Sequence, residues 1–150
     1  MIIKSFVLIE KDSKYLLIQE ASNKWRGKWF LPGGRVKKGE APDDAVTRET
    51  LEEAGCRVKL EGIFYIKCYD GFFSNKLHIF YTGTIEDNSI KTFEDKHSMG
   101  ARWFTYDEVR SLPVRQKMIK ILERHRKYKG TMSAKNFKMI FFRSPIKKLI

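Results

Sequence analysis

Three glutamates stand close together in one helix-forming stretch of the sequence. Glu49 precedes Glu52 by three residues and Glu53 by four, and these offsets place side chains on one face of a helix. Like charges at this spacing repel one another by about 0.2–0.5 kcal/mol per pair. Two interpretations follow: the stripe is a solvated acidic surface, or it binds a cation that neutralises it.

The residues around this stripe favour a cation site. A Pro-Gly-Gly turn at residues 32–34 precedes a helix that we expect over residues 41–54. Pro42 suits the first helical turn, where its missing N–H is not needed, and Gly55 can adopt the left-handed conformation of a C-cap. The sequence therefore predicts a well-delimited helix that presents its carboxylates beside a glycine-rich turn.

The opposite side of this helix is expected to be buried. Four residues share that side: Thr47, Thr50, Leu51 and Ala54. The acidic face would then turn away from the sheet. Arg48 lies four residues before Glu52, so its guanidinium can pair with a carboxylate and hold it in place.

The spacing of these residues resembles the signature of the Nudix hydrolases. The matching positions are Gly34, Glu40, Arg48, Glu49, Glu52, Glu53, Ala54 and Gly55. Thr50 and Cys56 stand where the family usually has aliphatic residues, and we expect altered packing there rather than lost chemistry. Similar segments at residues 15–20, 26–34 and 101–109 extend the resemblance to about residues 3–128.

The resemblance implies an α/β fold, the Nudix-type α/β/α sandwich with a mixed β-sheet. The pattern of apolar residues fits it, with strands on both sides of the first helix and a second helix late in the chain. The strands are expected at residues 6–9, 15–19, 29–31, 57–69, 76–85 and 101–104, and further helical segments at 106–111 and 115–129.

The resemblance also implies the roles of the motif residues. Glu49, Glu52, Glu53 and Arg48 would be catalytic, with the three glutamates and the Gly33 carbonyl as metal ligands, and with Glu40 and Arg48 orienting the carboxylates. Carboxylate oxygens without histidine or cysteine suit Mg²⁺, or Mn²⁺ as a substitute, better than Zn²⁺. Such a metal would bridge phosphate oxygens and acidify a bound water.

The general base stays open at this point. It is one of the helix glutamates, or a further carboxylate from the loop before Trp103, where Glu94 and Asp95 are the candidates and His97 is a non-carboxylate alternative. The lone His78, in an apolar strand, is expected to be structural.

The expected activity is Mg²⁺-dependent hydrolysis of a phosphoanhydride bond in a nucleoside diphosphate derivative. Residues 16–21 and 26–35 resemble the branch that hydrolyses oxidised guanine nucleotides such as 8-oxo-dGDP, so an oxidised purine nucleoside di- or triphosphate is preferred. An ADP-ribose-type pyrophosphatase is the alternative, although Gly71 stands where a proline would favour it.

The residues that select the substrate are harder to assign. Arg26 and Lys28 could bind phosphates, and aromatic side chains could stack on a base. The aromatic candidates are Trp25, Tyr65, Phe72 and Phe73. Ordinary packing is the competing interpretation for each of them.

Charge divides the chain into two parts. Residues 1–114 hold 18 Lys and Arg against 17 Asp and Glu, whereas residues 115–150 hold 12 against one. We therefore expect a Nudix domain at residues 1–129 and a basic, partly apolar extension at 130–150. The extension could add a strand to the domain, support a homodimer or bind an anionic partner. A rival to the enzyme is thus a weakly catalytic module that binds RNA or an anionic surface.

Composition also suggests the compartment. Cys56 and Cys68 lack metal-ligand spacing, and no apolar run approaches the roughly 20 residues of a membrane-spanning helix. The first 20 residues read as two strands rather than a signal peptide. We expect a cytoplasmic protein with reduced thiols and no transmembrane segment.

Overall fold

A hairpin of two strands that pair next to their turn opens the fold. The computed structural model describes residues 1–128, and its first strands are β1 (Ile2–Lys11) and β2 (Lys14–Glu20). The connecting residues Asp12 and Ser13 have φ of 50° and 59°, the left-handed conformation that a type I′ hairpin turn requires at both positions. Polar residues between two β-prone runs predict this turn correctly.

The strands form one mixed sheet. Its main path runs β3 (Trp29–Phe30), β2, β1, β6 (Lys76–Ile85) and β5 (Val58–Tyr69). In addition, β4 (Gly33–Arg35) pairs with β1, and β7 (Ser98–Thr105) pairs with β2. The β1–β6 pair is parallel, and the other strand pairs are antiparallel.

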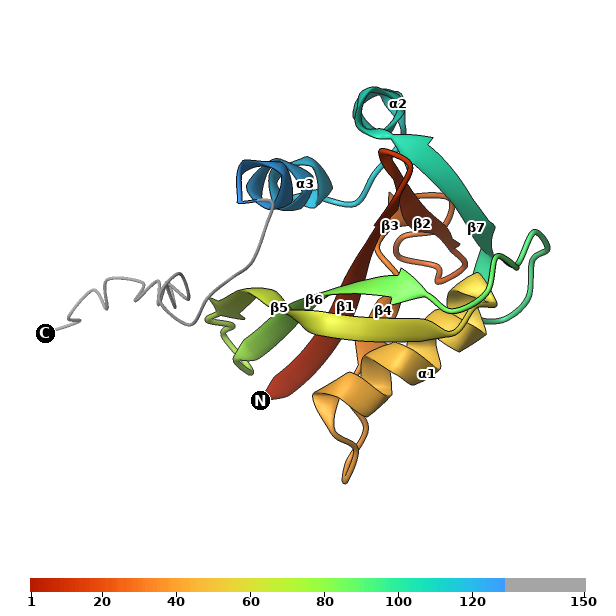
Figure 1. Cartoon of the computed structure of the whole chain (residues 1–150). Coiled ribbons are helices and arrows are strands. Elements are labelled where there is room, and N and C mark those ends of the chain that lie inside the picture. Colours follow the sequence, from red (N-terminus) through yellow and green to blue (C-terminus); the bar gives the residue numbers. More distant parts are fainter. Residues whose placement is uncertain (129–150) are drawn as a thin grey trace, which may run out of the picture.

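Helices cover both faces of this sheet, as Figure 1 shows. Helix α1 (Pro42–Ala54) packs on the face that contains Val7 and Ile9, where Val46 and Ala54 join the buried cluster. On the opposite face, α2 (Tyr106–Ser111) and α3 (Met118–Lys127) contribute apolar side chains to a second cluster. The predicted α/β/α sandwich with a mixed sheet is confirmed.

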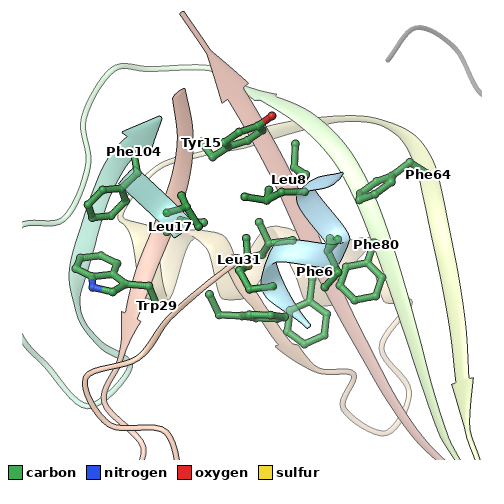
Figure 2. Packing of buried hydrophobic residues seen from close by; sticks show 14 residues of the cluster. Phe6, Leu8, Tyr15, Leu17, Trp29, Leu31, Phe64, Phe80 and Phe104 are labelled. Atoms are coloured by element: carbon green, nitrogen blue, oxygen red, sulfur yellow. The ribbon is translucent and has the colours of Figure 1, made fainter. Parts of the chain in front are cut away.

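The core under α3 is rich in aromatic rings. Phe6, Leu8, Phe64 and Phe80 converge there from β1, β5 and β6, as seen in Figure 2. The rings of Phe6 and Phe80 stack with centroids 5.3 Å apart. This packing fixes β1 against β6, and the outer ends of these two strands are therefore rigid supports for any site built on them.

Most predicted boundaries lie within three residues of those observed, but β1 begins at Ile2 rather than at residue 6, and β4 at Gly33–Arg35 was not predicted as a strand. Gly62 lies at a register shift of β5, as its position inside a strand pattern suggested, and α3 ends at Lys127 rather than at residue 129. No helix of residues 1–128 is both long and apolar enough to cross a membrane. The extension at 130–150, and with it the predicted division of the chain after residue 129, lies outside the described residues.

Candidate active site

The Pro-Gly-Gly turn and the acidic helix meet at Glu53. The backbone N–H of Gly33 donates to Glu53 Oε2 over 2.9 Å. Gly33 has a φ of 140°, and a Cβ there would collide with the Ser5 carbonyl oxygen. Glycine is therefore required at this position of β4, where the strand pairs with β1. The helix carboxylate is thereby tied directly to the turn.

Glu53 is a buried acid in an acidic surrounding. Only 8% of the residue is exposed. Burial raises the pKa of Glu53 well above its usual range, the Gly33 N–H opposes this, and the charges of Glu49 and Glu20 raise that pKa further. A negative charge at this position is costly unless a cation compensates it.

Arg48 organises the other carboxylates. Its Nη1 lies 3.0 Å from Glu49 Oε1 and 3.1 Å from Glu52 Oε2, and its Nε lies 2.7 Å from Glu40 Oε1. Its Nη2 also donates to Glu40 Oε2 over 3.1 Å. One guanidinium therefore fixes three carboxylates, as its planar array of donors allows.

Glu40 ties this assembly to the loop before α1. Its Oε2 accepts from the Lys37 N–H over 2.9 Å. The hydrogen bond from Arg48, and then that from Lys37, lowers the pKa of Glu40 to about 2. Contacts with Glu40 and then Glu49 raise the pKa of Arg48, so this pair stays charged at neutral pH.

Each metal-ligand candidate keeps one carboxylate oxygen available. Within residues 1–128, hydrogen bonds and ion pairs engage Oε1 of Glu49, Oε2 of Glu52 and Oε2 of Glu53. Residue 34 must be glycine for the Glu49 carboxylate to take this position, since a Cβ there would lie 2.6 Å from Glu49 Oε1. Among the described side chains no group of three is already arranged as a metal site, but the oxygen-only donor set fits a hard divalent cation.

The buried face of α1 differs from the one expected. Thr50 and Ala54 are fully buried, and the Thr50 hydroxyl donates to the Val46 carbonyl over 2.7 Å. Thr47 and Leu51 are exposed instead, so the prediction was wrong for them. The buried side includes Glu53, because the Gly33 N–H satisfies its carboxylate and makes burial tolerable.

The loop after β6 and the first residue of β7 cap the C-terminal end of α1. The Lys91 ammonium donates to the Glu52 carbonyl over 2.7 Å, and the Ser98 hydroxyl donates to the Glu53 carbonyl over 2.6 Å. The Lys91 N–H donates to the Ala54 carbonyl. These contacts satisfy carbonyls that a helix end leaves unpaired, and they hold the backbone of the two glutamates in place.

The two candidate extra carboxylates are engaged in this loop. Asp95 Oδ1 accepts from Lys91 Nζ over 2.8 Å and from backbone N–H groups, and the Lys91 contact is the largest cause of a strongly lowered pKa of Asp95. Glu94 forms an exposed ion pair with Arg26 at 2.6 Å. His97 is the loop side chain that reaches the helix glutamates, with Nδ1 3.5 Å from Glu52 Oε2.

The substrate-binding candidates are dispersed. Arg26 pairs with Glu94, and Lys28 lies over the Trp25 ring at 5.7 Å. Phe72 and Phe73 project from the β5–β6 turn, are 97% and 96% exposed and contact each other. The structure therefore does not gather these four predicted residues into one pocket.

A pair that the sequence did not indicate lies beside Glu53. Arg115, in the segment before α3, places Nη1 2.7 Å from Glu20 Oε1, with both side chains largely buried. Glu20 raises the pKa of Glu53, and Arg115 lowers it. The partners are 95 residues apart, and no local pattern connects them.

Comparisons with known proteins place this arrangement in a family. The NUDIX domain model matches residues 4–125, and the chain belongs to the Nudix family. A Caenorhabditis elegans protein named as a nudix hydrolase is 33% identical over 101 residues, 67% of this chain and 27% of that protein. A solved NUDIX hydrolase from Nitrosomonas europaea has a TM-score of 0.73 and 25% identity, covering 83% of this chain and 88% of that one.

Two further relatives carry substrate names. The 8-oxo-dGDP phosphatase NUDT18 of Homo sapiens is 39% identical over 61 residues, 41% of this chain and 19% of that protein. The ADP-ribose pyrophosphatase of Methanocaldococcus jannaschii is 45% identical over 56 residues, 37% of this chain and 33% of that protein. The chain spans 19% to 41% of the length of the first curated relatives it matches.

Proposed function

We propose that the chain hydrolyses a phosphoanhydride bond in a nucleoside diphosphate derivative and depends on Mg²⁺, for which Mn²⁺ can substitute. One observation carries the proposal. Glu49, Glu52 and Glu53 are each held by one carboxylate oxygen, and each keeps its second oxygen free within residues 1–128. A merely solvated acidic surface has no need of this positioning.

The proposed ligands are the three glutamates and the Gly33 carbonyl, with Glu40 and Arg48 as orienting residues. A bound divalent cation would neutralise the carboxylates, screen the charge of the phosphates and acidify a water. Arg48 bridges Glu49 and Glu52 and holds both in place, and the turn at Gly33 holds Glu53. This prior ordering lowers the entropic cost of forming the reactive geometry.

We assign the general base to one of the helix glutamates. Glu94 and Asp95 contact Arg26 and Lys91 rather than the three helix glutamates, so a base among the helix glutamates lies nearer to the proposed metal ligands. His97, close to Glu52, is placed to orient that carboxylate. The accepted proton would move to solvent through the exposed edge of the helix.

For the substrate we propose an oxidised purine nucleoside di- or triphosphate. The resemblance of residues 16–21 and 26–35 to that branch supports it, together with the name of the Homo sapiens relative. ADP-ribose-type pyrophosphatase activity is the second candidate, favoured by the higher identity to the archaeal relative over a short segment. Both substrates contain the same kind of scissile bond.

The test is phosphate release from a panel of nucleotides with Mg²⁺. The panel includes 8-oxo-dGDP, whose phosphate is measured directly, 8-oxo-dGTP, measured with and without inorganic pyrophosphatase, and ADP-ribose, for which alkaline phosphatase releases phosphate from the monoester products. The Glu52→Gln and Glu53→Gln variants should each lose about 10³-fold in turnover, because several kcal/mol of charge stabilisation are removed. Glu61→Gln, on the exposed part of β5, is the matched control. Absence of turnover on the whole panel, or turnover that both active-site changes leave intact, contradicts the proposal.

A rival proposal concerns the basic extension. The charge of +11 on residues 115–150 favours binding of RNA or an anionic surface, with steep salt dependence. Truncation after Lys129 should then weaken retention on RNA or anionic vesicles while leaving nucleotide turnover unchanged. Equal retention by both forms would refute this role, and loss of turnover would instead assign the extension to the fold or to a homodimer.

A further inference from the structure

A second concave region lies on the α3 side of the sheet. It is a cavity of about 290 Å³ formed by β1, β6, the loop after β2 and the segment before α3. We call it the basic pocket because of the cations that line it: Lys4, Lys24, Lys76, Arg115 and Lys117. Asp70 is the one acidic residue of the described chain that lines it.

These cations have little compensation from the protein. Arg115 pairs with Glu20, but within residues 1–128 no carboxylate lies within ion-pair distance of the four pocket lysines. Burial, followed by the charge of Arg115, lowers the pKa of Lys4. Crowding of like charges of this kind is relieved when an anion binds between them.

The aromatic rings of the pocket hold cations rather than presenting free faces. Lys24 and Arg115 lie over the Trp25 ring at 5.1 Å and 4.9 Å. Lys117 lies over the Tyr69 ring at 4.5 Å. A neutral base would have to displace these cations before it could stack, whereas an anion would add to them.

His78 lines the same pocket as an uncharged side chain. Its backbone is paired with Lys4 across the parallel β1–β6 register, and its Nε2 is buried without a hydrogen-bond partner among residues 1–128. Burial and then the charge of Lys4 lower the pKa of His78 to about 4, so the ring is neutral at pH 7. Because Nε2 is itself inaccessible, His78 contributes a neutral wall between the cations rather than a ligand for the phosphate.

The basic pocket adjoins the acidic site. Arg115 lines the pocket and pairs with Glu20 at 2.7 Å, and Lys4, which also lines the pocket, is paired in the strand register with Arg35 of β4. Lys4 stands two residues before Phe6, whose backbone pairs with Gly33. One small molecule could therefore extend from the Gly33–Glu53 turn into the basic pocket.

We propose that the basic pocket binds a second phosphate group of the substrate, remote from the bond that is cleaved. The proposal rests on the proposed phosphoanhydride hydrolysis, and it names a substrate class other than the oxidised purine nucleotides preferred above: nucleoside diphosphate derivatives that carry an additional phosphomonoester. A cavity of about 290 Å³ is at the lower limit for small-molecule sites, about 300–1,000 Å³. It suits one end of such a molecule better than a strand of RNA.

Two matched ligand pairs test the proposal: ADP-ribose 2′-phosphate against ADP-ribose, and coenzyme A against dephospho-coenzyme A. Binding to the full chain is measured by calorimetry in EDTA, where metal-dependent hydrolysis does not interfere, and kcat/KM is measured with Mg²⁺. At least one phosphorylated member should bind about tenfold more tightly, the effect of about 1.4 kcal/mol from charge-assisted hydrogen bonds. The Lys4→Gln/Lys76→Gln variant should lose this preference, and Lys59→Gln, an exposed lysine on β5, should keep it.

Equal binding within both pairs by the wild type overturns the proposal, as does a preference that survives in the double variant. Because Lys4 is partly buried, the exposed Lys76→Gln is also measured alone and should reduce the preference. The proposal is also overturned if the wild type binds a 5′-diphosphorylated oligonucleotide more tightly than these small ligands and the added phosphomonoester gives no gain in their affinity. That result would assign the pocket to RNA. A binding preference without turnover of any nucleotide would contradict only the proposed function; turnover without the preference would contradict only this inference.

Discussion

Two clusters of like charge lie close together in this protein, and they differ in whether other protein groups compensate their charge. In the acidic site, Arg48 holds Glu49 and Glu52, and the Gly33 N–H holds Glu53. In the basic pocket, the lysines have no carboxylate partner among the described residues. The protein itself thus holds the carboxylates of the acidic site in place, whereas the lysines of the basic pocket would be compensated by the ligand that we propose.

The contact between the two clusters is the pair of Glu20 and Arg115. This largely buried ion pair, with Arg115 Nη1 2.7 Å from Glu20 Oε1, lies between the carboxylates of the acidic site and the lysines of the basic pocket. Removing one partner of such a pair leaves an uncompensated charge, so damage at this point should reach both clusters. The comparison therefore predicts different consequences for changes within the acidic site, between the sites and outside them.

The largest effect is expected from Glu53→Gln. Turnover should fall about 10³-fold, because several kcal/mol of stabilisation are lost with the buried carboxylate. Stability should change in the opposite direction. The native state without metal retains a proton on Glu53 that the unfolded state releases, so the free energy of unfolding of the wild type should decrease as pH rises through the raised pKa of Glu53.

Denaturant unfolding in EDTA at pH 5 and pH 8 measures this difference. The wild type should lose stability between the two values, and Glu53→Gln should lose less. Mg²⁺ should restore stability to the wild type alone. If both proteins respond equally to pH and to Mg²⁺, the charge of Glu53 does not lower the stability of the native state and Mg²⁺ does not compensate it.

Arg48→Lys should have the next largest effect. A lysine keeps the positive charge but cannot reach Glu40, Glu49 and Glu52 together with one planar group. Loss of such a supporting contact typically costs about 10–100-fold in metal affinity or activity. Steady-state kinetics across a Mg²⁺ titration should show the loss mainly as a higher Mg²⁺ requirement. Arg102→Lys, on an exposed position of β7, is the control; an unchanged Mg²⁺ requirement in Arg48→Lys would show that the guanidinium does not order the ligands.

Arg115→Gln should affect both clusters moderately. It removes the partner of Glu20 and one of the cations of the basic pocket. We expect turnover and ligand affinity to fall together, and we expect non-additivity with Glu20→Gln, of about 0.5–3 kcal/mol, as contacting residues show. A double-mutant cycle on kcat/KM measures it. Strictly additive effects would mean that the two clusters are independent.

Much of the fold is predictable from local sequence signals. The turn at residues 12–13, the irregularity at Gly62 and the cap at Gly55 follow from residue types with distinct backbone preferences. The acidic stripe is similarly local, since it depends on offsets of three and four within one helix. The family resemblance also rested on such contiguous spacing.

The errors arise where distant segments meet. Leu51 was expected to be buried and is 51% exposed, whereas Glu53 is buried. A helical pattern ranks side chains by polarity, but burial of Glu53 depends on an N–H donated by Gly33, 20 residues away. The basic pocket was missed for the same reason. Its cations come from strand ends and loops, and only the β1–β6 register brings Lys4 beside His78.

The smallest effect on catalysis is expected at Asp95, which distinguishes a carboxylate in the scaffold from one in the acidic site. Asp95→Asn should leave kcat nearly unchanged, because the side chain contacts Lys91 and loop N–H groups rather than Glu49, Glu52 or Glu53. It should lower the melting temperature by a few degrees, since Lys91 then loses its partner while still capping α1. Glu86→Gln, exposed at the end of β6, is the control.

The stabilisation by the Asp95 carboxylate should depend on pH. Contact with Lys91 lowers the pKa of Asp95, so its contribution to stability is complete above the pKa of the unfolded chain, near 3.9, and is lost as pH falls toward the lower native value. Melting curves of wild type and Asp95→Asn should therefore differ at pH 7 and converge in acid. A large loss of kcat at an unchanged melting temperature would contradict this prediction. It would show that Asp95 acts in catalysis together with the three helix glutamates.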